Sequence, residues 1–264
     1  MIDIHSHILP GVDDGPRNWE EAIALCRRIA EEGITTSVAT PHLIDGVYDN
    51  ILSRVEPLVQ QLREHLRTAG VALEVLSGAE VDFSSRRVTT GDDELPTLGG
   101  SGAVLLEMPV AVIPPAIEET IFSLRARRLV PVIAHPERNE LLQENPQLAV
   151  EWVRAGALLQ LDGDSLLGLW GRLAKRCSEA LLRRGLVHAL ATDAHSVDRR
   201  PPRMKKALAQ AAAVIGEQAR TLVTDGPAMI LAGKTPEGPL YTVEPQAAAG
   251  NLRSRSGARG LIDR

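Results

Sequence analysis

The chain has 264 residues, of which 44% are hydrophobic, 24% charged and 3% aromatic, and its net charge is −5. The length fits one large domain such as an α/β barrel of roughly 250 residues, and the ordinary apolar fraction excludes a disordered chain. The acidic charge argues against a nucleic-acid partner, and no run reaches the roughly 18 apolar residues that membrane insertion needs. MIDIHSH does not resemble a signal peptide and two cysteines form no disulfide framework, so we expect a cytoplasmic protein.

Seven short apolar runs rich in β-branched residues alternate with segments of helical periodicity. The runs cover residues 2–5, 34–40, 73–80, 103–108, 130–135, 157–162 and 186–193. This alternation predicts βα units around a parallel sheet.

The segments between the runs are predicted to be helices. Asn18 is a good N-cap for the first helix, whose apolar residues share one stripe, and Gly33 ends it. Further helices are predicted over residues 51–67, 114–128, 146–154, 165–184 and 202–215. Pro57 is expected either to kink the 51–67 helix or to mark its true start.

The domain organisation is predicted from the change in composition near residue 234. Residues 1–233 contain no linker and are predicted to form a single domain. Residues 234–264 are rich in Pro, Gly, Ala and Arg, which predicts a flexible C-terminal tail.

Imidazole and carboxylate side chains gather where the predicted strands end. They are His5, His7, Asp14, His42, Glu80, Glu107, His135, Asp193 and His195. In a βα barrel the carboxyl ends of the strands form the active-site face, and these side chains are ligands for Zn, Mn or Fe. Nine ligands exceed the coordination of one ion, so two or three divalent ions are predicted. Without metals the carboxylates would repel one another, whereas three ions and a bridging hydroxide leave a slightly positive site that suits phosphate.

Other histidines and cysteines have structural interpretations. His65 and His188 are predicted to be core residues. Cys177 and Arg183 match the Cys-x5-Arg pattern of thiol-dependent tyrosine phosphatases, but the segment lacks the glycine of a phosphate loop and is predicted to be helix interior. Phe83, shortly after Glu80, is one candidate for an aromatic wall near the site.

The motifs resemble the PHP (polymerase and histidinol phosphatase) superfamily, and within it the manganese-dependent tyrosine phosphatases of bacterial capsule and exopolysaccharide operons. The resemblance rests on the segments DIHSH at 3–7, DDGP at 13–16, TPH at 40–42, GAE at 78–80, HPER at 135–138, TDAH at 192–195 and RPP at 200–202. It implies a PHP-type, TIM-barrel-like fold: a distorted seven-stranded (βα)7 barrel.

The resemblance also implies how three ions are held. One ion would take His5, His7, Glu80 and Asp193; a second Glu80, Glu107 and His135; a third Asp14, His42 and His195. Manganese is the expected metal, with iron and zinc as alternatives.

Arg138 and Arg200 are predicted to bind phosphate. Each lies a few residues after a predicted metal ligand, and a guanidinium group matches two phosphate oxygens in a fork.

The predicted reaction is hydrolysis of a phosphomonoester by attack of a metal-bridging hydroxide on phosphorus. The resemblance favours a protein-tyrosine phosphatase acting on a phosphotyrosyl protein, with a bacterial tyrosine kinase of polysaccharide export as the partner. A PHP phosphoesterase acting on a small phosphate such as histidinol phosphate is the alternative. A non-catalytic module is disfavoured because all nine ligand positions hold competent residues.

Overall fold

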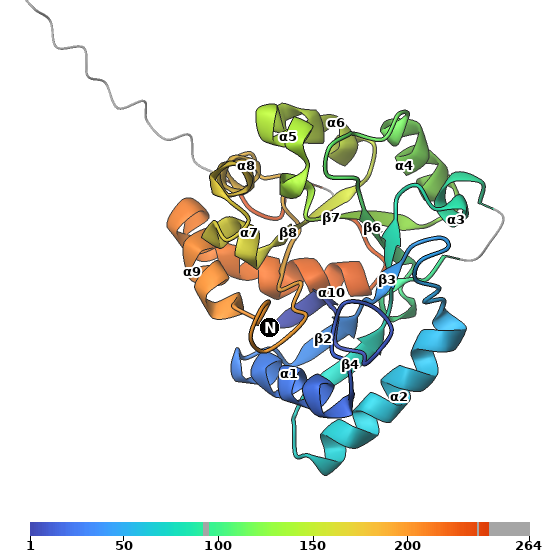
Figure 1. The fold of residues 1–264 in the computed structure, drawn as a ribbon. Helices are drawn as coiled ribbons and strands as arrows, with labels where there is room; N and C mark the ends of the chain where they lie inside the picture. The colour runs from blue at the N-terminus through green and yellow to red at the C-terminus, as the bar shows by residue number, and fades with distance from the viewer. Residues whose placement is uncertain (92–94, 237, 243–264) are drawn as a thin grey trace, which may run out of the picture.

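A computed structural model describes residues 1–91, 95–236 and 238–242, which form a mixed α/β fold (Figure 1). The strands are β1 (Ile2–Ser6), β2 (Thr36–Ala39), β3 (His42–Leu43), β4 (Glu74–Ser77), β5 (Glu80–Asp82), β6 (Ala103–Glu107), β7 (Val130–Ala134), β8 (Leu158–Asp162) and β9 (Ala189–Ala191). The α-helices are α1 (Trp19–Glu31), α2 (Leu52–Thr68), α3 (Arg86–Thr89), α4 (Ile117–Ala126), α5 (Glu140–Glu144), α6 (Ala149–Arg154), α7 (Gly163–Leu167), α8 (Arg172–Arg183), α9 (Met204–Ile215) and α10 (Asp225–Leu231). Short 3-10 helices are η1 (Leu98–Gly100), η2 (Pro136–Arg138), η3 (Pro146–Leu148) and η4 (Gly216–Val223).

The described strands form two parallel sheets, in the orders β1-β2-β4 and β3-β5-β6-β7-β8-β9. The parallel α/β prediction is confirmed, but the single seven-stranded barrel is not. The chain changes sheets at two places: β2, in the predicted run 34–40, is followed at once by β3 in the other sheet, and the predicted run 73–80 spans β4 and the start of β5. Pro41 lies at the first break and has no N–H to continue a ladder, while Gly78 lies at the second.

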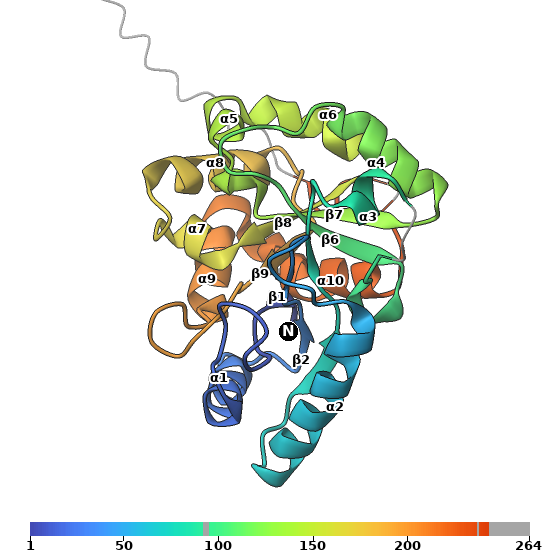
Figure 2. The same cartoon turned by 45° about the vertical axis from the view of Figure 1, so that its right-hand side comes forward.

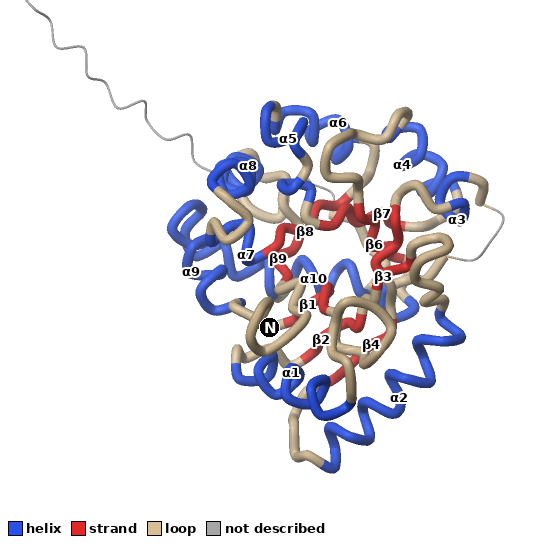
Figure 3. The backbone as a smooth tube through the Cα atoms, viewed as in Figure 1, coloured by secondary structure: helices blue, strands red, loops and turns tan. Residues whose placement is uncertain are grey.

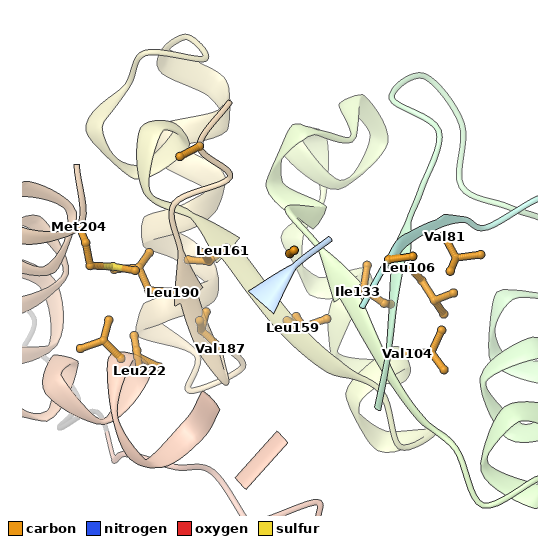
Figure 4. Packing of buried hydrophobic residues seen from close by; sticks show 14 of the residues in the cluster. Val81, Val104, Leu106, Ile133, Leu159, Leu161, Val187, Leu190, Met204 and Leu222 are labelled. Carbon is orange, nitrogen blue, oxygen red and sulfur yellow. The ribbon is translucent and has the colours of Figure 1, made fainter. Parts of the chain in front are cut away.

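The strands curve around a common centre with most helices outside them, whereas α10 lies across the centre of the ring in these views (Figures 2 and 3). Apolar residues therefore form two clusters. An inner cluster, enclosed by both sheets, contains Ile4, Val38, Leu105, Val132 and Ala191, and Ile230 of α10 belongs to it. An outer cluster packs the opposite strand faces against the helices. Figure 4 shows part of this outer cluster, in which Leu190 lies near Met204 of α9 and Leu222 of η4.

The first helix confirms the predicted local signals. The Asn18 side chain accepts a hydrogen bond from the Glu21 N–H at 3.0 Å, and Gly33 takes a left-handed φ of 83°. The interpretation of Pro57 as a helix start is wrong, because α2 begins at Leu52 and contains Pro57. A proline this close to the amino end removes a single backbone hydrogen bond, which packing of the apolar face offsets.

The helix predicted over residues 165–184 is wrong in its middle. The structure has α7 and α8 there, separated by a turn in which Gly168 and Gly171 have φ angles of 86° and 95°. Left-handed backbone at two positions ends one helix before the next begins. Both flanking segments have an amphipathic pattern, so the sequence was interpreted as one continuous helix.

Part of the predicted tail packs on the domain. Tyr241 is 3% exposed and joins the outer cluster, and Gln218 and Thr242 exchange two hydrogen bonds of 2.9 and 3.0 Å. Residues 243–264 of that tail lie outside the described residues. Among the described helices, none has both the length and the apolar character required to cross a bilayer.

Candidate metal centre

The inward positions of the strands change from apolar to polar toward the carboxyl ends. Along β6 the sequence Ala103, Leu105, Glu107 faces inward, and along β8 the sequence is Leu158, Gln160, Asp162. Residues two apart on a strand point to the same side, so the inner cluster continues directly into a layer of polar side chains. This layer contains the candidate site.

All nine predicted ligands lie together in this layer. Four overlapping groups have ligating atoms within 4.8 Å of one another: His7, Asp14, His42 and His195; His5, His7 and Asp193; His5, Glu80 and His135; and His42, Glu80 and Glu107. Four residues each belong to two of these groups and so connect them: His5, His7, His42 and Glu80. The geometry therefore offers several adjacent cation positions instead of one.

The hydrogen bonds of His5 and His7 leave one nitrogen of each ring facing the centre. His5 Nδ1 lies 2.8 Å from Gln160 Oε1, and His7 Nδ1 lies 2.8 Å from Asp13 Oδ2. Both partners accept hydrogen bonds, so each Nδ1 carries a proton and the Nε2 of the neutral ring carries a lone pair. The two Nε2 atoms are 3.2 Å apart. Two lone pairs at this distance repel unless a proton or a metal cation lies between them.

Two further atoms at the centre lack hydrogen-bond partners. Glu80 Oε2 and His42 Nδ1 are buried without a hydrogen bond, although they lie 3.0 Å apart. Buried polar atoms without partners are costly, and a divalent ion would satisfy both. The residues present thus fit a metal centre of nitrogen and oxygen ligands.

Burial and crowding alter the proton affinity of these groups. Burial and the nearby Glu80 carboxylate raise the pKa of Glu107 to about 7. Burial opposes protonation of His5, yet the carboxylates of Glu80 and Asp193 raise its pKa to about 9. Both shifts have one cause: negative charge collects in a buried space that requires positive charge to balance it.

Two of the candidate ligands have unusual backbone angles. His135 and Asp193 follow β7 and β9 with φ angles of 30° and 47°. Left-handed backbone at non-glycine residues costs free energy and is found where tertiary contacts hold it in place. These turns aim both side chains back over the ends of their strands.

The two predicted phosphate-binding arginines lie beside this centre. Arg138 Nη2 donates to Asp193 Oδ2 at 2.6 Å and to Asp162 Oδ2 at 2.7 Å. Arg200 donates to Asp193 Oδ2 and, at 2.9 Å, to His195 Nε2. The guanidinium groups are therefore oriented by carboxylates of the centre itself.

A cavity of about 200 Å³ joins the arginines to the ligands. Its polar lining includes His42, Glu80, Glu107, His135, Asp193, Arg138 and Arg200, and its apolar lining includes Met108, Val110 and Trp170. Trp170 stacks on the arginines: the Arg138 Cζ atom lies 4.2 Å and the Arg200 Cζ atom 5.4 Å from its ring centroid.

Comparison with known proteins places this site in a family. A family model described as "Capsular polysaccharide synthesis, CpsB/CapC" matches residues 1–232. The chain belongs to the CpsB/CapC family. All nine candidate ligands and both arginines lie within the matched residues, and the predicted likeness to capsule-operon phosphatases is confirmed at the family level.

Individual CpsB/CapC relatives agree in sequence and structure. The chain is 34% identical over 236 residues to "Tyrosine-protein phosphatase YwqE" of Bacillus subtilis, covering 89% of this chain and 93% of that protein. It is 31% identical over 238 residues to "Tyrosine-protein phosphatase CpsB" of Streptococcus pneumoniae, covering 88% and 98%. A solved structure from work on YwqE and CpsB, described as "unique metal-dependent tyrosine phosphatases", matches with a TM-score of 0.85 at 33% identity, covering 93% of this chain and 100% of that one.

Several residues of this CpsB/CapC site were not predicted. Asp13 and Gln160 orient His7 and His5, Asp162 orients Arg138, and Trp170 forms part of the cavity wall. Asp13 adjoins a predicted ligand in sequence, and the glycines at 168 and 171 were a local signal for the turn that carries Trp170. Gln160 and Asp162 come from a strand that contributes no predicted ligand.

Phe83, Cys177, His188 and His65 do not line this cavity. Phe83 is 3% exposed in the outer cluster, so its assignment as the aromatic wall is wrong. Cys177 is buried in α8, where burial raises its thiol pKa to about 12, and this supports rejecting the Cys-x5-Arg match. His188 is a core residue as predicted. The same prediction is wrong for His65, which is half-buried against Trp19 with ring centroids 4.6 Å apart.

Proposed function

We propose that this chain is a metal-dependent protein-tyrosine phosphatase. The observation that carries the proposal is the clustering of nine candidate ligands, five of which line one cavity together with two carboxylate-oriented arginines. The relatives, named as tyrosine-protein phosphatases, support the reaction class.

The nine residues that we propose as ligands would hold two or three divalent ions, with manganese expected. His5, His7, Glu80 and Asp193 would hold one ion, Glu80, Glu107 and His135 a second, and Asp14, His42 and His195 a third. When bound, divalent ions neutralise charge on the phosphoryl oxygens and lower the pKa of water.

The chain's own residues orient the substrate. Arg138 and Arg200 each offer N–H groups to the oxygens of the phosphoryl group, which stabilises the charge that they carry as the group is transferred. A bond forms between a water oxygen and phosphorus while the bond from phosphorus to the tyrosyl oxygen breaks. The products are inorganic phosphate and a tyrosine whose phenolic oxygen has gained one proton of the water. A phenolic leaving group of pKa about 10 departs with little protonic assistance.

The proposed substrate is a phosphotyrosyl protein, and the family's link to capsular polysaccharide synthesis supports a tyrosine kinase of polysaccharide export as the partner. We further propose that residues 1–233 form one functional domain, on which the first part of the predicted tail, through Thr242, packs. In this domain the two sheets would act as one distorted barrel. The inner cluster shared by both sheets and the parallel bridge between Ser6 and Ala194 support that arrangement.

The test compares phosphate release from a phosphotyrosyl peptide and from histidinol phosphate, with Mn²⁺ and with chelator. Manganese-dependent turnover of the peptide is expected, with loss in His42→Ala and retention in the matched control His65→Ala, since His65 lies away from the centre. Preference for histidinol phosphate would replace the substrate assignment with a small phosphate. Turnover that survives the chelator would contradict the metal-dependent reaction.

A further inference from the structure

The turn between α7 and α8 presents a large aromatic side chain to solvent. Trp170 is 46% exposed. Its turn is closed by backbone hydrogen bonds from Gly168 to Ser165, from Leu169 to Asp164 and from Gly171 to Gly168, all between 2.9 and 3.1 Å. A tryptophan held at the surface by a rigid turn leaves apolar area in water, which is unfavourable unless something covers it.

Trp170 is one part of an apolar wall on the cavity that holds the ligands. Met108 and Val110, from the segment after β6, complete this wall. Their segment is held in place by Asn139, whose side-chain amide donates to the carbonyls of Pro109 and Val112, each at 2.8 Å. The wall is therefore formed by two anchored loops, and one of them is tied to the residue that follows Arg138.

The dimensions of this cavity suit a single aromatic ring beside a phosphoryl group. An apolar protein cavity of about 150 Å³ accommodates benzene, and this cavity has about 200 Å³ and opens to solvent. Trp170 lies directly against the arginines in its lining, so a phosphoryl group bound by them would have its ester substituent close to the apolar wall.

The arginines and the indole form a continuous surface. The Arg138 guanidinium carbon lies 4.2 Å from the Trp170 ring centroid, so the face of the indole supports the phosphate-binding group while the rest of the ring stays accessible. An aromatic substituent on a phosphate held by Arg138 would thus lie within reach of the indole.

We propose that Trp170 is a specificity-determining residue that contacts the aromatic ring of the substrate and favours aryl over alkyl phosphate monoesters. This inference rests on the proposed phosphatase function and names the part of the site that selects tyrosyl phosphate. It assigns to the α7–α8 turn a role in substrate choice, separate from phosphate binding by Arg138 and Arg200.

The test uses the manganese-loaded full chain and two non-hydrolysable probes, phenylphosphonate and methylphosphonate, as competitive inhibitors. Trp170→Ala is expected to raise the inhibition constant of phenylphosphonate roughly three- to tenfold, the range typical of one aromatic contact. The inhibition constants of methylphosphonate and inorganic phosphate should change by no more than about twofold. Trp170→Phe should keep most of the preference. Leu169→Ala is the matched control, because Leu169 is 59% exposed on the same turn and does not line the cavity.

Two results would overturn the assignment. If Trp170→Ala leaves the ratio of the two phosphonate constants unchanged, the indole does not contact the ring. If the substitution weakens inhibition by phenylphosphonate, methylphosphonate and phosphate equally, Trp170 acts only by positioning Arg138. Failure of the proposed function is distinguishable, since the wild-type chain would then release no phosphate from the phosphotyrosyl peptide whatever the phosphonate ratio.

Discussion

Buried histidines occur at both ends of the strands, and their surroundings differ. His188 precedes β9 at the amino end, where its Nδ1 accepts a hydrogen bond from the Leu159 N–H at 3.1 Å. At the carboxyl end, His5 is fixed by Gln160 through Nδ1, and its Nε2 lies 3.3 Å from carboxylate oxygens of both Glu80 and Asp193. Both rings are at most 3% exposed.

The difference shows that burial alone does not make a site. Burial lowers the pKa of His188 to about 4, and the ring stays neutral with a backbone partner. His5 lies among carboxylates and another imidazole nitrogen, an arrangement that remains unbalanced without added positive charge. A structural histidine and a candidate ligand therefore differ in the surroundings of the second ring nitrogen, Nε2.

The largest effect is expected at Glu80, which faces His5, His7, His42 and His135. Glu80→Gln should lower kcat/KM for a phosphotyrosyl peptide by about 1000-fold and reduce the bound manganese per chain, since it removes a charge shared by two ligand groups. Steady-state kinetics and metal analysis of the purified protein measure both. Glu64→Gln, on the exposed face of α2, is the control. Unchanged metal content in Glu80→Gln would contradict the shared-ligand assignment.

A smaller but still large effect is expected at Arg138. Arg138→Ala should lower kcat/KM by roughly 100-fold while metal content is retained, because two N–H groups for the phosphoryl oxygens are lost. Arg138→Lys should recover only part of this, since an ammonium group cannot make the forked contact. Arg154→Ala is the control, as Arg154 pairs with Glu151 on the surface of α6. An equal loss of kcat/KM in both alanine variants would contradict the assignment of Arg138 to phosphate binding.

Asp13 tests whether orientation of a ligand matters as much as its presence. Asp13→Ala removes the acceptor for His7 Nδ1 and for the His42 N–H, at 2.8 and 3.2 Å, so we expect manganese affinity to fall about 10- to 100-fold. Titration calorimetry with Mn²⁺ measures this directly. Asp49 lies on an exposed loop, and the Asp49→Ala control should bind Mn²⁺ with the wild-type affinity. Equal affinity in both variants would mean that His7 needs no orienting carboxylate.

The smallest effect concerns stability at the other end of the strands. The folded-state pKa of His188, about 4, lies below the ordinary 6.5, so the unfolded chain takes up the proton first as the pH falls. The contribution of neutral His188 to the free energy of unfolding is therefore complete above about pH 6.5 and declines toward pH 4. The decline amounts to roughly 2 kcal/mol between about pH 7.5 and pH 4.5. His188→Asn should lose less stability over this interval in urea unfolding. A parallel decline in both proteins would falsify the assignment of His188 as a buried neutral group.

The strand ends and the clustering of the candidate ligands there could be predicted because both depend on short-range patterns. Apolar runs mark the strands, and His5 with His7, or Asp193 with His195, lie within two residues of each other. Parallel strands bring their carboxyl ends together, so spacing along the chain was enough to expect one cluster. Asp162 and Gln160 were missed because they act on residues 24 and 155 positions away, through contacts that no local pattern encodes.

The sequence by itself determined the chemistry of this protein: which side chains could bind metal or phosphate, and at which strand ends they lie. Only the tertiary structure decided how the strands divide into two sheets, which nitrogen of each imidazole faces the centre, and that Trp170 rather than Phe83 forms the aromatic wall. The physical reason is that residue type sets what a group can do, whereas its partners and exposure depend on packing between segments that are distant in the chain.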